Sequence, residues 1–218
     1  LSLTGNTSGS VVTLGWETPD FSSAVPEAVT ESFEDYVSFA SSGVGDWIFV
    51  DADGAKTGKL QDISIPGVHD NPEGAVTSFW VMDADYEGLN GSFAARSGSK
   101  YIAQMFNAGG VACDDWAITP ELYGEGQEVS FYAKSYSSYS SQAETFEVYY
   151  SEGGVAISDF KLIEKIDAVP NVWTCYKWTL KPGARRFAIR CTSVDKYMLM
   201  VDDVYSGERQ RGITAGRL

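Results

Sequence analysis

Alternation of apolar and polar residues with a period of two is the strongest pattern in this chain. It is clearest in the segments "VSFYA" (129–133) and "FEVYY" (146–150), and it returns at residues 172–180, 185–192 and 197–205. A period of two sends successive side chains to opposite faces of a β-strand, whereas capped stripes with the period of a helix are scarce. Many short strands separated by Gly, Pro and Ser predict an all-β fold, a jelly-roll β-sandwich.

Three parts follow one another along the chain. Residues 1–29 hold one alternating strand, Val11 to Pro19, and a linker-like segment, and we expect them to come from a preceding module. Residues 30–205 carry the strand pattern and form the predicted jelly-roll domain. Residues 206–218 have no apolar period and are predicted to be a linker. The sequence therefore predicts one domain flanked by pieces of a larger modular protein.

The charge of the chain excludes one large class of partner. The sequence has 218 residues, enough for one substantial domain, and a net charge of −14 with one histidine. Nucleic-acid binding depends on clustered Lys and Arg, so no nucleic-acid partner is predicted. No run of about 18 apolar residues is present, so no membrane-spanning segment is predicted. The acidity is explained either by a solvated surface or by carboxylates that form cation sites.

The three cysteines show no metal or redox motif. Cys113, Cys175 and Cys191 form no CxxC pair, and their odd number leaves at least one of them free. Cys191 is in phase with Phe187 and Ile189, so we expect it to be a small buried apolar residue. A disulfide between Cys175 and Cys191, joining two strands, is the alternative.

The segment "VDADG" places Asp51 and Asp53 one residue apart, before Gly54. An EF-hand does not fit, because glycine stands at the fourth position of the loop and Asp62, not glutamate, at the twelfth. The five residues alone are compatible with a turn, since aspartate bonds its own backbone and glycine accepts a positive φ. They are also compatible with part of a metal loop.

Other carboxylates lie in strands that are too apolar for a solvated surface. Glu34 begins the first core strand beside Phe33, and Asp202 and Asp203 interrupt the apolar strand "YMLMVDDVYSG". A buried carboxylate is costly unless it is paired or bound to metal. If the first and last core strands are neighbours, Glu34 and Asp202 face one cavity and the loop at Asp51 closes over it. Hard oxygen donors of this kind favour Ca²⁺ over zinc.

Five motifs, taken in order, resemble one family. The segments "ESFED", "VDADG", "DDWAITPEL", "FEVYYSEGGVAISDFKLIE" and "VWTCYKWTLKPGARRFAIRCTSVDKYMLMVDDV" are similar to the cleaved-adhesin domains of gingipain-type haemagglutinin/adhesin proteins from Bacteroidetes. The resemblance covers roughly residues 30–205. It implies a calcium-stabilised jelly roll like those of galactose-binding and carbohydrate-binding modules, on a secreted or cell-surface protein. Its acidic positions match Glu34, Asp51, Asp53 and Asp202, with Asp203 at a position where either acid occurs.

The sequence offers little to an enzyme. In regular strands the adjacent pairs Asp114-Asp115 and Asp202-Asp203 point to opposite faces, so neither forms a two-carboxylate cleft. We expect Asp114 and Asp115 to cap or brace a turn before the strand 116–119. His69 lies in a Pro/Gly loop with no nucleophile signature around any cysteine. The chain is predicted to be non-catalytic.

Two groups of aromatic residues are candidates for ligand contacts. Tyr136 and Tyr139 belong to a Tyr/Ser-rich hairpin, and tyrosine gives contact area at a small cost in entropy. Trp80 and Tyr86 lie in a Gly/Pro/Asp/Asn-rich stretch, residues 54–89, that predicts a long surface excursion. The alternatives are a solvated hairpin for the tyrosines and core filling for Trp80.

The predicted function is attachment to a host surface or matrix protein or to a glycan. A carbohydrate-binding module that carries an attached enzyme to a polysaccharide would use the same fold, so the fold does not decide between the two. A structural spacer between modules is the third possibility.

Overall fold

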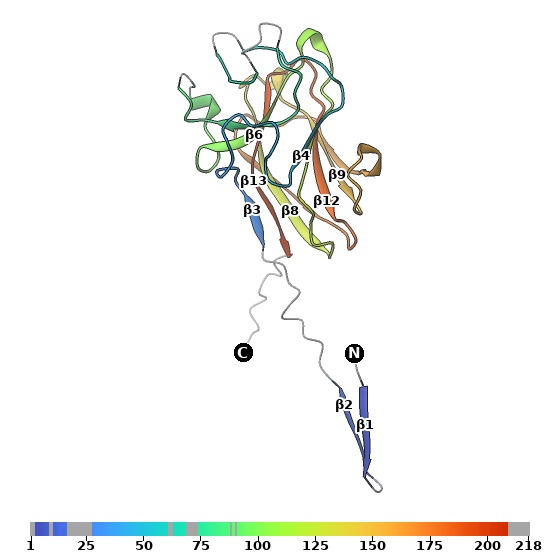
Figure 1. The fold of residues 1–218 in the computed structure, drawn as a ribbon. Helices are drawn as coiled ribbons and strands as arrows, with labels where there is room; N and C mark the ends of the chain where they lie inside the picture. The colour runs from blue at the N-terminus through green and yellow to red at the C-terminus, as the bar shows by residue number, and fades with distance from the viewer. Residues whose placement is uncertain are drawn as a thin grey trace, which may run out of the picture.

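The computed structural model describes residues 3–8, 11–16, 28–60, 63–68, 74–87, 89 and 91–208, with side chains described only from residue 28 onward. Within these residues the structure consists of strands, loops and short 3-10 helices (Figure 1). The 3-10 helices are η1 (Gly91–Phe93), η2 (Ala108–Gly110), η3 (Ser140–Gln142) and η4 (Ile157–Asp159).

Two antiparallel sheets form the body of the molecule. The five-stranded sheet has the order β10 (Lys161–Ile166), β9 (Phe146–Ser151), β12 (Arg186–Cys191), β7 (Asp115–Ile118) and β4 (Ile48–Asp51). The six-stranded sheet has the order β11 (Thr174–Thr179), β8 (Gln127–Ser135), β13 (Met198–Glu208), β6 (Lys100–Met105) and β5 (Trp80–Asp83), and β3 (Val29–Glu31) also pairs with β13. These two sheets confirm the predicted all-β sandwich.

A separate two-stranded sheet pairs β1 (Leu3–Ser8) with β2 (Val11–Trp16). The strand predicted from Val11 onward is therefore present. His69, residues 17–27 and the predicted linker from residue 209 onward lie outside the described residues.

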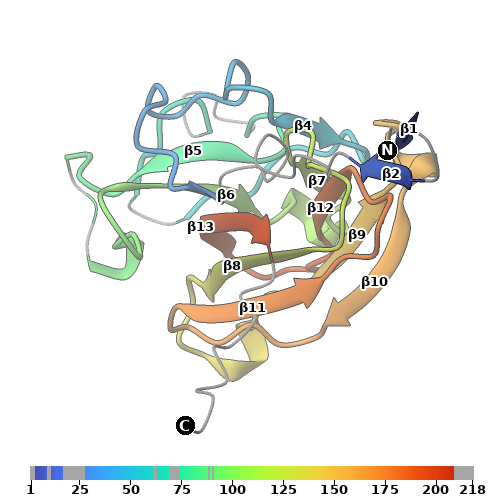
Figure 2. The same ribbon diagram turned by 90° about the horizontal axis from the view of Figure 1, so that it is seen from below.

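The main core lies between the two large sheets, where the period-two pattern places it. Alternate residues of β8 and β9, among them Phe131, Phe146 and Val148, are fully buried against Phe187 and Ile189 of β12. Burial of each such side chain contributes on the order of 2 kcal/mol. The edges of the two sheets approach each other at β10 and β11 (Figure 2), where the Trp178 indole donates a hydrogen bond of 2.7 Å to Glu164.

A second apolar cluster covers part of the outer face of the six-stranded sheet. Trp80 and Met82 of β5, with outward-facing residues of β6 and β13, pack beneath Leu60, Ile65 and Val68. These three residues come from the stretch 54–89, which the sequence predicted to be a surface excursion. The stretch is therefore partly a cover for the sheet, and it also contains β5. Its apolar residues are spaced irregularly because they pack as a loop.

The first and last strands of the sandwich, β3 and β13, are neighbours, as the sequence argument required, but Glu34 lies in a turn after β3 and does not begin the first strand as predicted. β3 pairs with β13 through Glu31 opposite Val204 and Val29 opposite Ser206. The last strand continues to Glu208, three residues beyond the predicted domain boundary at Tyr205. This pairing brings Glu34, shortly after β3, towards the aspartates of β13.

The cysteines do not form the disulfide that the sequence allowed. Cys175 is exposed on β11 of the six-stranded sheet, whereas Cys191 is fully buried on β12 of the other sheet. All three cysteines are free, and the prediction that Cys191 is a buried apolar residue is confirmed.

Candidate functional site

Three aspartates meet where β4 ends and β7 begins. Asp51 and Asp115 stand directly opposite each other in the antiparallel ladder of these strands. A turn after β4 brings in Asp53, and one carboxylate oxygen of each residue lies within 4.8 Å of the others. Like charges in this arrangement destabilise a sheet unless a cation or protons offset them.

The turn after Asp51 is held by its own carboxylates. Asp51 Oδ1 accepts a hydrogen bond of 2.6 Å from the amide of Gly54, whose φ of 65° suits glycine. Asp53 accepts 2.8 Å from the amide of Ala55 and 2.6 Å from the amide of Asp114. Asn107 Nδ2 donates a further bond of 3.0 Å to Asp53 Oδ2. The two interpretations of "VDADG", a turn and part of a metal loop, are thus compatible, because the turn orders the carboxylates.

Three buried oxygens around this turn have no hydrogen-bond partner. They are Asp51 Oδ2, Asp115 Oδ1 and Gln104 Oε1. The amide nitrogen of Gln104 donates a bond of 2.6 Å to the other oxygen of Asp115. Burial, with the charges of Asp53 and Asp51, raises the pKa of Asp115 to about 8. An unpartnered buried acceptor costs roughly 1–3 kcal/mol of stability. A proton or a cation bound to these oxygens would therefore stabilise the folded chain.

The acidic cluster, defined as Asp51, Asp53 and Asp115, fits a hard divalent cation. Its donors are carboxylate oxygens, the unpartnered oxygens are hard acceptors, and Gln104 adds an amide oxygen. Oxygen donors in an irregular arrangement suit Ca²⁺, which takes six to eight ligands with flexible geometry. Zinc prefers imidazole and thiolate, and the cluster contains neither.

Asp115 was not among the predicted metal residues. The sequence interpretation, that Asp114 and Asp115 brace a turn before the next strand, is wrong for Asp115, which is buried as the first residue of β7. The signal was available: Asp115 is in phase with Cys113 and Ala117, both of which belong to the core. Asp114 does brace its surroundings, since its carboxylate accepts bonds of 2.7 Å from Trp116 Nε1 and Arg190 Nε.

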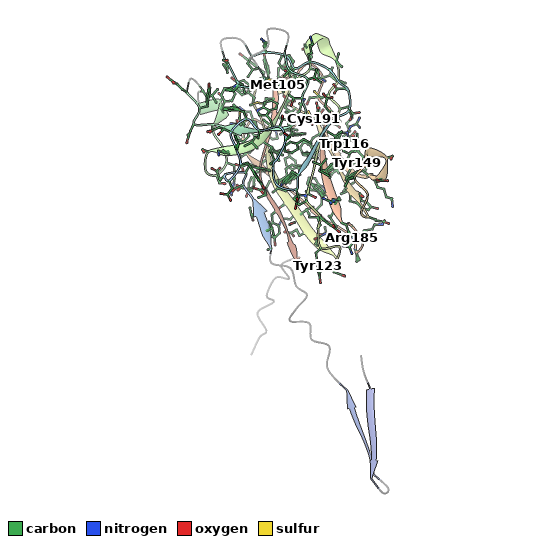
Figure 3. The ribbon with its side chains drawn as sticks, in the orientation of Figure 1. Met105, Trp116, Tyr123, Tyr149, Arg185 and Cys191 are labelled. Atoms are coloured by element: carbon green, nitrogen blue, oxygen red, sulfur yellow. The ribbon has the colours of Figure 1, made fainter. Side chains whose placement is uncertain are left out.

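The side chains around Asp114 occupy the outer face of the five-stranded sheet. Trp116 and Tyr149 lie together there (Figure 3), with ring centroids 4.7 Å apart. Arg190 lies over the Trp116 ring and also pairs with Glu147 at 2.9 Å. Asp114 is thus an ion-pair partner, and the acidic cluster does not include it.

Glu34, Asp202 and Asp203 meet a different segment, residues 96–100, which leads into β6. Glu34 Oε1 accepts bonds of 2.9 and 2.7 Å from the amides of Ser99 and Lys100. Asp202 Oδ2 accepts bonds of 2.9 and 3.2 Å from the amides of Arg96 and Ser97. Asp203 pairs with the Arg96 guanidinium at 2.6 Å and accepts a bond of 2.8 Å from Ser97 Oγ.

A bulge in β13 allows both adjacent aspartates to reach this segment. The pairing of β13 with β8 shifts register between Asp202 and Tyr205, and Asp203 has a φ of 48°. A bulge re-aims a side chain, so Asp202 and Asp203 no longer point to opposite faces as they would in a regular strand. Burial raises the pKa of Asp202 to about 7, which the amide donors of Ser97 and Asp203 partly counteract.

The expected single cavity around Glu34, Asp202 and the Asp51 loop is therefore divided. Glu34 and Asp202 do meet at one segment, but Asp51 and Asp53 join Asp115 instead. Backbone amides and Arg96 supply hydrogen bonds to Glu34, Asp202 and Asp203. Among the described residues, the buried carboxylate oxygens that lack a hydrogen-bond partner belong to Asp51 and Asp115. The fit to a cation is thus at the acidic cluster.

A hollow of about 430 Å³ lies beside the predicted tyrosine hairpin. We call it the tyrosine hollow, and it is lined by Leu60, Ile63, Ser92, Lys134, Tyr136, Ser137, Ser138, Tyr139, Asn171 and Tyr197. Tyr136 is packed between Phe93 and Tyr197, with ring centroids 4.8 and 6.2 Å away. Tyr139 is 72% exposed at the rim. The structure thus brings Tyr136 and Tyr139 into one concave surface.

The other two aromatic candidates lie elsewhere. Trp80 is 2% exposed within the second apolar cluster, so the expectation that it meets a ligand does not hold, and the core-filling alternative is correct. Tyr86 is 42% exposed and packs edge-on against Phe39. It does not line the tyrosine hollow.

Comparison with solved structures shows the fold shared by a set of adhesin domains. The K2 cleaved adhesin domain of Lys-gingipain superposes with a TM-score of 0.64 at 16% identity, over 83% of this chain and 99% of that domain. The K1 domain from Porphyromonas gingivalis gives 0.60 at 20% identity, over 84% and 99%. The K3 domain from the same organism gives 0.57 at 18% identity, over 84% and 99%.

Comparison of the sequence gives no match. No family model and no curated protein matches the chain. The resemblance to cleaved-adhesin domains that the five motifs indicated is therefore carried by the fold.

No helix in the described part of the chain is long and apolar enough to cross a membrane.

Proposed function

We propose that this chain is a non-catalytic adhesin domain of a secreted or bacterial cell-surface protein, which binds a glycan or a protein on a host surface. The observation that carries the proposal is the tyrosine hollow, about 430 Å³ in volume, on an adhesin-type sandwich. A concave site of this size with a few polar groups among aromatic rings is typical of ligand-binding sites.

The chemistry of the hollow suits a ligand with hydroxyl or amide groups. Three tyrosines, three serines and Asn171 offer phenolic, hydroxyl and amide groups. Lys134 is buried, and its ammonium donates a bond of 2.8 Å to the carbonyl of Ser92. Burial lowers the pKa of Lys134, and its ammonium already has the carbonyl of Ser92 as a partner. Tyr139 at the rim supplies a flat, exposed contact surface.

Calcium is the proposed cofactor, and its proposed role is structural. Asp51, Asp53 and Asp115 would hold it, with Gln104 as a further oxygen donor. The ion would neutralise the like charges of β4 and β7 and tie the turn after β4 to the start of β7. We assign a different role to Glu34, Asp202 and Asp203: their carboxylates hold residues 96–100 in place.

A carbohydrate-binding module that serves an attached enzyme is the second candidate. The same hollow would bind a polysaccharide, so the distinction lies in the ligand and in the neighbouring modules.

Binding to immobilised host matrix proteins and to a broad glycan array tests the proposal. The wild-type chain should bind at least one of these surfaces in calcium, and Tyr139→Ala should bind it about ten-fold more weakly. Tyr123→Ala is the control, because Tyr123 is also an exposed tyrosine but does not line the tyrosine hollow. Binding that is unchanged in Tyr139→Ala would refute the hollow as the site.

A further inference from the structure

The outer face of the six-stranded sheet is covered over one half and open over the other. The covered half, on β5, β6 and the start of β13, carries the second apolar cluster beneath its loops. The open half, on β3, β8, β11 and the end of β13, forms a hollow of about 330 Å³. We call it the open-face hollow, and its floor is built from Ser130, Tyr132, Cys175 and Tyr205.

One wall of the open-face hollow is the segment that begins at Arg96. The Arg96 guanidinium lies 4.0 Å from the centroid of the Tyr132 ring and pairs with Asp203 at 2.6 Å. The main chain of the same segment is fixed by Asp202 and Glu34. The bulge in β13 and the positive φ of Asp203 are what aim Asp203 at Arg96. Strained backbone that orders a wall in this way is concentrated at binding sites.

The opposite wall is formed by a second ion pair. Lys177 of β11 pairs with Glu128 of β8 at 2.9 Å. Both cations of the hollow are therefore neutralised by carboxylates that also line it. The two positive and two negative side chains leave the hollow with no net charge, which favours a neutral ligand. Between the walls, two tyrosine rings and the hydroxyls of Ser130 and Thr30 offer stacking surface and hydrogen bonds.

The open-face hollow is distinct from the tyrosine hollow. Both use outward-facing residues of β8, with Tyr132 in one and Lys134 in the other. Between them Trp173 donates a hydrogen bond of 3.1 Å to the carbonyl of Ala94. The 4.8 Å contact of Phe93 with Tyr136 belongs to the tyrosine hollow. One strand therefore presents two separate concave surfaces.

We infer that the open-face hollow is a second ligand site, and that it binds a neutral saccharide. The saccharide ring packs against Tyr205 and Tyr132, and its hydroxyl groups bond Ser130, Thr30 and the paired carboxylates of Glu128 and Asp203. This site does not depend on the tyrosine hollow, so the two can be tested separately.

Cys175 provides a direct reporter of occupancy, because its thiol is exposed within the hollow. The rate of Cys175 alkylation by N-ethylmaleimide is measured by mass spectrometry, with and without the neutral glycans that bind on an array. A bound saccharide should slow alkylation about ten-fold, in wild type and in Tyr139→Ala alike. Alkylation at an unchanged rate under saturating glycan would overturn the inference.

Filling the hollow gives a second, independent readout. Cys175→Trp places a large side chain into the open-face hollow from an exposed strand position, without removing a core contact. It should weaken binding of neutral glycans about ten-fold or more. Leu162→Trp, at an exposed position on edge strand β10 of the other sheet, is the control and should bind as wild type.

The outcomes separate the two sites. Loss of glycan binding in Cys175→Trp but not in Tyr139→Ala supports the open-face hollow alone, and loss in both supports two sites. Loss in Tyr139→Ala with full binding in Cys175→Trp rejects the open-face hollow and leaves the proposed function standing. Absence of any neutral glycan bound by the folded wild-type chain in calcium also rejects it.

Discussion

Asp51 Oδ2 and Asp115 Oδ1 belong to directly opposed residues of β4 and β7, and both are buried without a hydrogen-bond partner. Two such oxygens at one point of a sheet are costly, since each has lost water and gained nothing in return. The surrounding turn is nevertheless well ordered by Gly54, Ala55 and Asn107. Local order around unmet acceptors is what a cation site requires.

Removal of Asp115 should abolish the response of the fold to calcium. With calcium at about one hundred times its Kd, binding stabilises the chain by about 2.7 kcal/mol, which for this size raises Tm by about 5–10 °C. Asp115→Asn removes one charged oxygen from the acidic cluster, so we expect most of that shift to disappear. The measurement is a thermal melt with calcium and with chelator.

The matched control is Asp85→Asn, because Asp85 is exposed and lies outside the acidic cluster. It should keep the full calcium shift. If wild type melts at the same temperature in calcium and in chelator, the structural calcium site does not exist.

Replacement of Asp202 should lower the stability of the fold but leave its response to calcium unchanged. Asp202 Oδ2 accepts from the amides of Arg96 and Ser97, and Oδ1 accepts from the amide of Asp203, so the NH2 group of Asp202→Asn faces a donor in either orientation. We expect a loss of about 1–3 kcal/mol in unfolding free energy, with the calcium-induced shift retained. Hydrogen exchange should rise at residues 96–100. Loss of calcium binding with unchanged exchange would instead assign Asp202 to the metal.

Most of the fold could be predicted from the sequence because period-two burial fixes both strand existence and face. The alternating residues of β8, β9 and β12 are the buried ones, and Cys191 follows its phase. The same argument failed for residues 54–89, because Leu60, Ile65 and Val68 lie in loops that cover the sheet and have no periodic spacing. Composition rich in Gly and Pro then resembles a solvated excursion.

The site was predicted in its residue types but not in its grouping. Asp51, Asp53, Glu34 and Asp202 were all identified as unusual carboxylates, yet which of them meet depends on sheet order. β4 lies beside β7, so Asp51 meets Asp115, and that pairing is a long-range fact. Likewise, the bulge at Asp203 depends on its pairing with β8, and it reverses the rule that adjacent strand residues point apart.

Stability should fall as pH rises from about 4.5 to about 7 because of Glu144, which is buried at 1% exposure. Burial raises its pKa from 4.5 to about 7. Between these values the unfolded chain has lost the proton while the folded chain keeps it, so the unfolding free energy declines with pH. The decline is complete above pH 7 and amounts to up to about 3 kcal/mol.

Glu144→Gln has no proton to lose and can still accept the 2.8 Å bond from the amide of Tyr197. The measurement is chemical denaturation of both proteins in calcium from pH 4 to pH 8. The unfolding free energy of the variant, relative to wild type, should rise with pH across this window. A constant difference would show that Glu144 ionises normally in the folded chain.

Thiol reactivity should separate Cys175 from the other two cysteines. Cys175 is exposed, whereas Cys113 and Cys191 are 3% and 0% exposed, and burial raises the pKa of the Cys191 thiol well above its ordinary value. Since the thiolate is the nucleophile, a buried thiol of high pKa reacts only after the structure opens. The native protein should therefore release one equivalent of chromophore from a disulfide reagent, and the denatured, reduced protein three.

Cys175→Ser should release none while native and two when denatured. Rapid reaction of native Cys175→Ser would mean that the ladder between β7 and β12 opens readily. In that case the edge that carries the acidic cluster would be mobile.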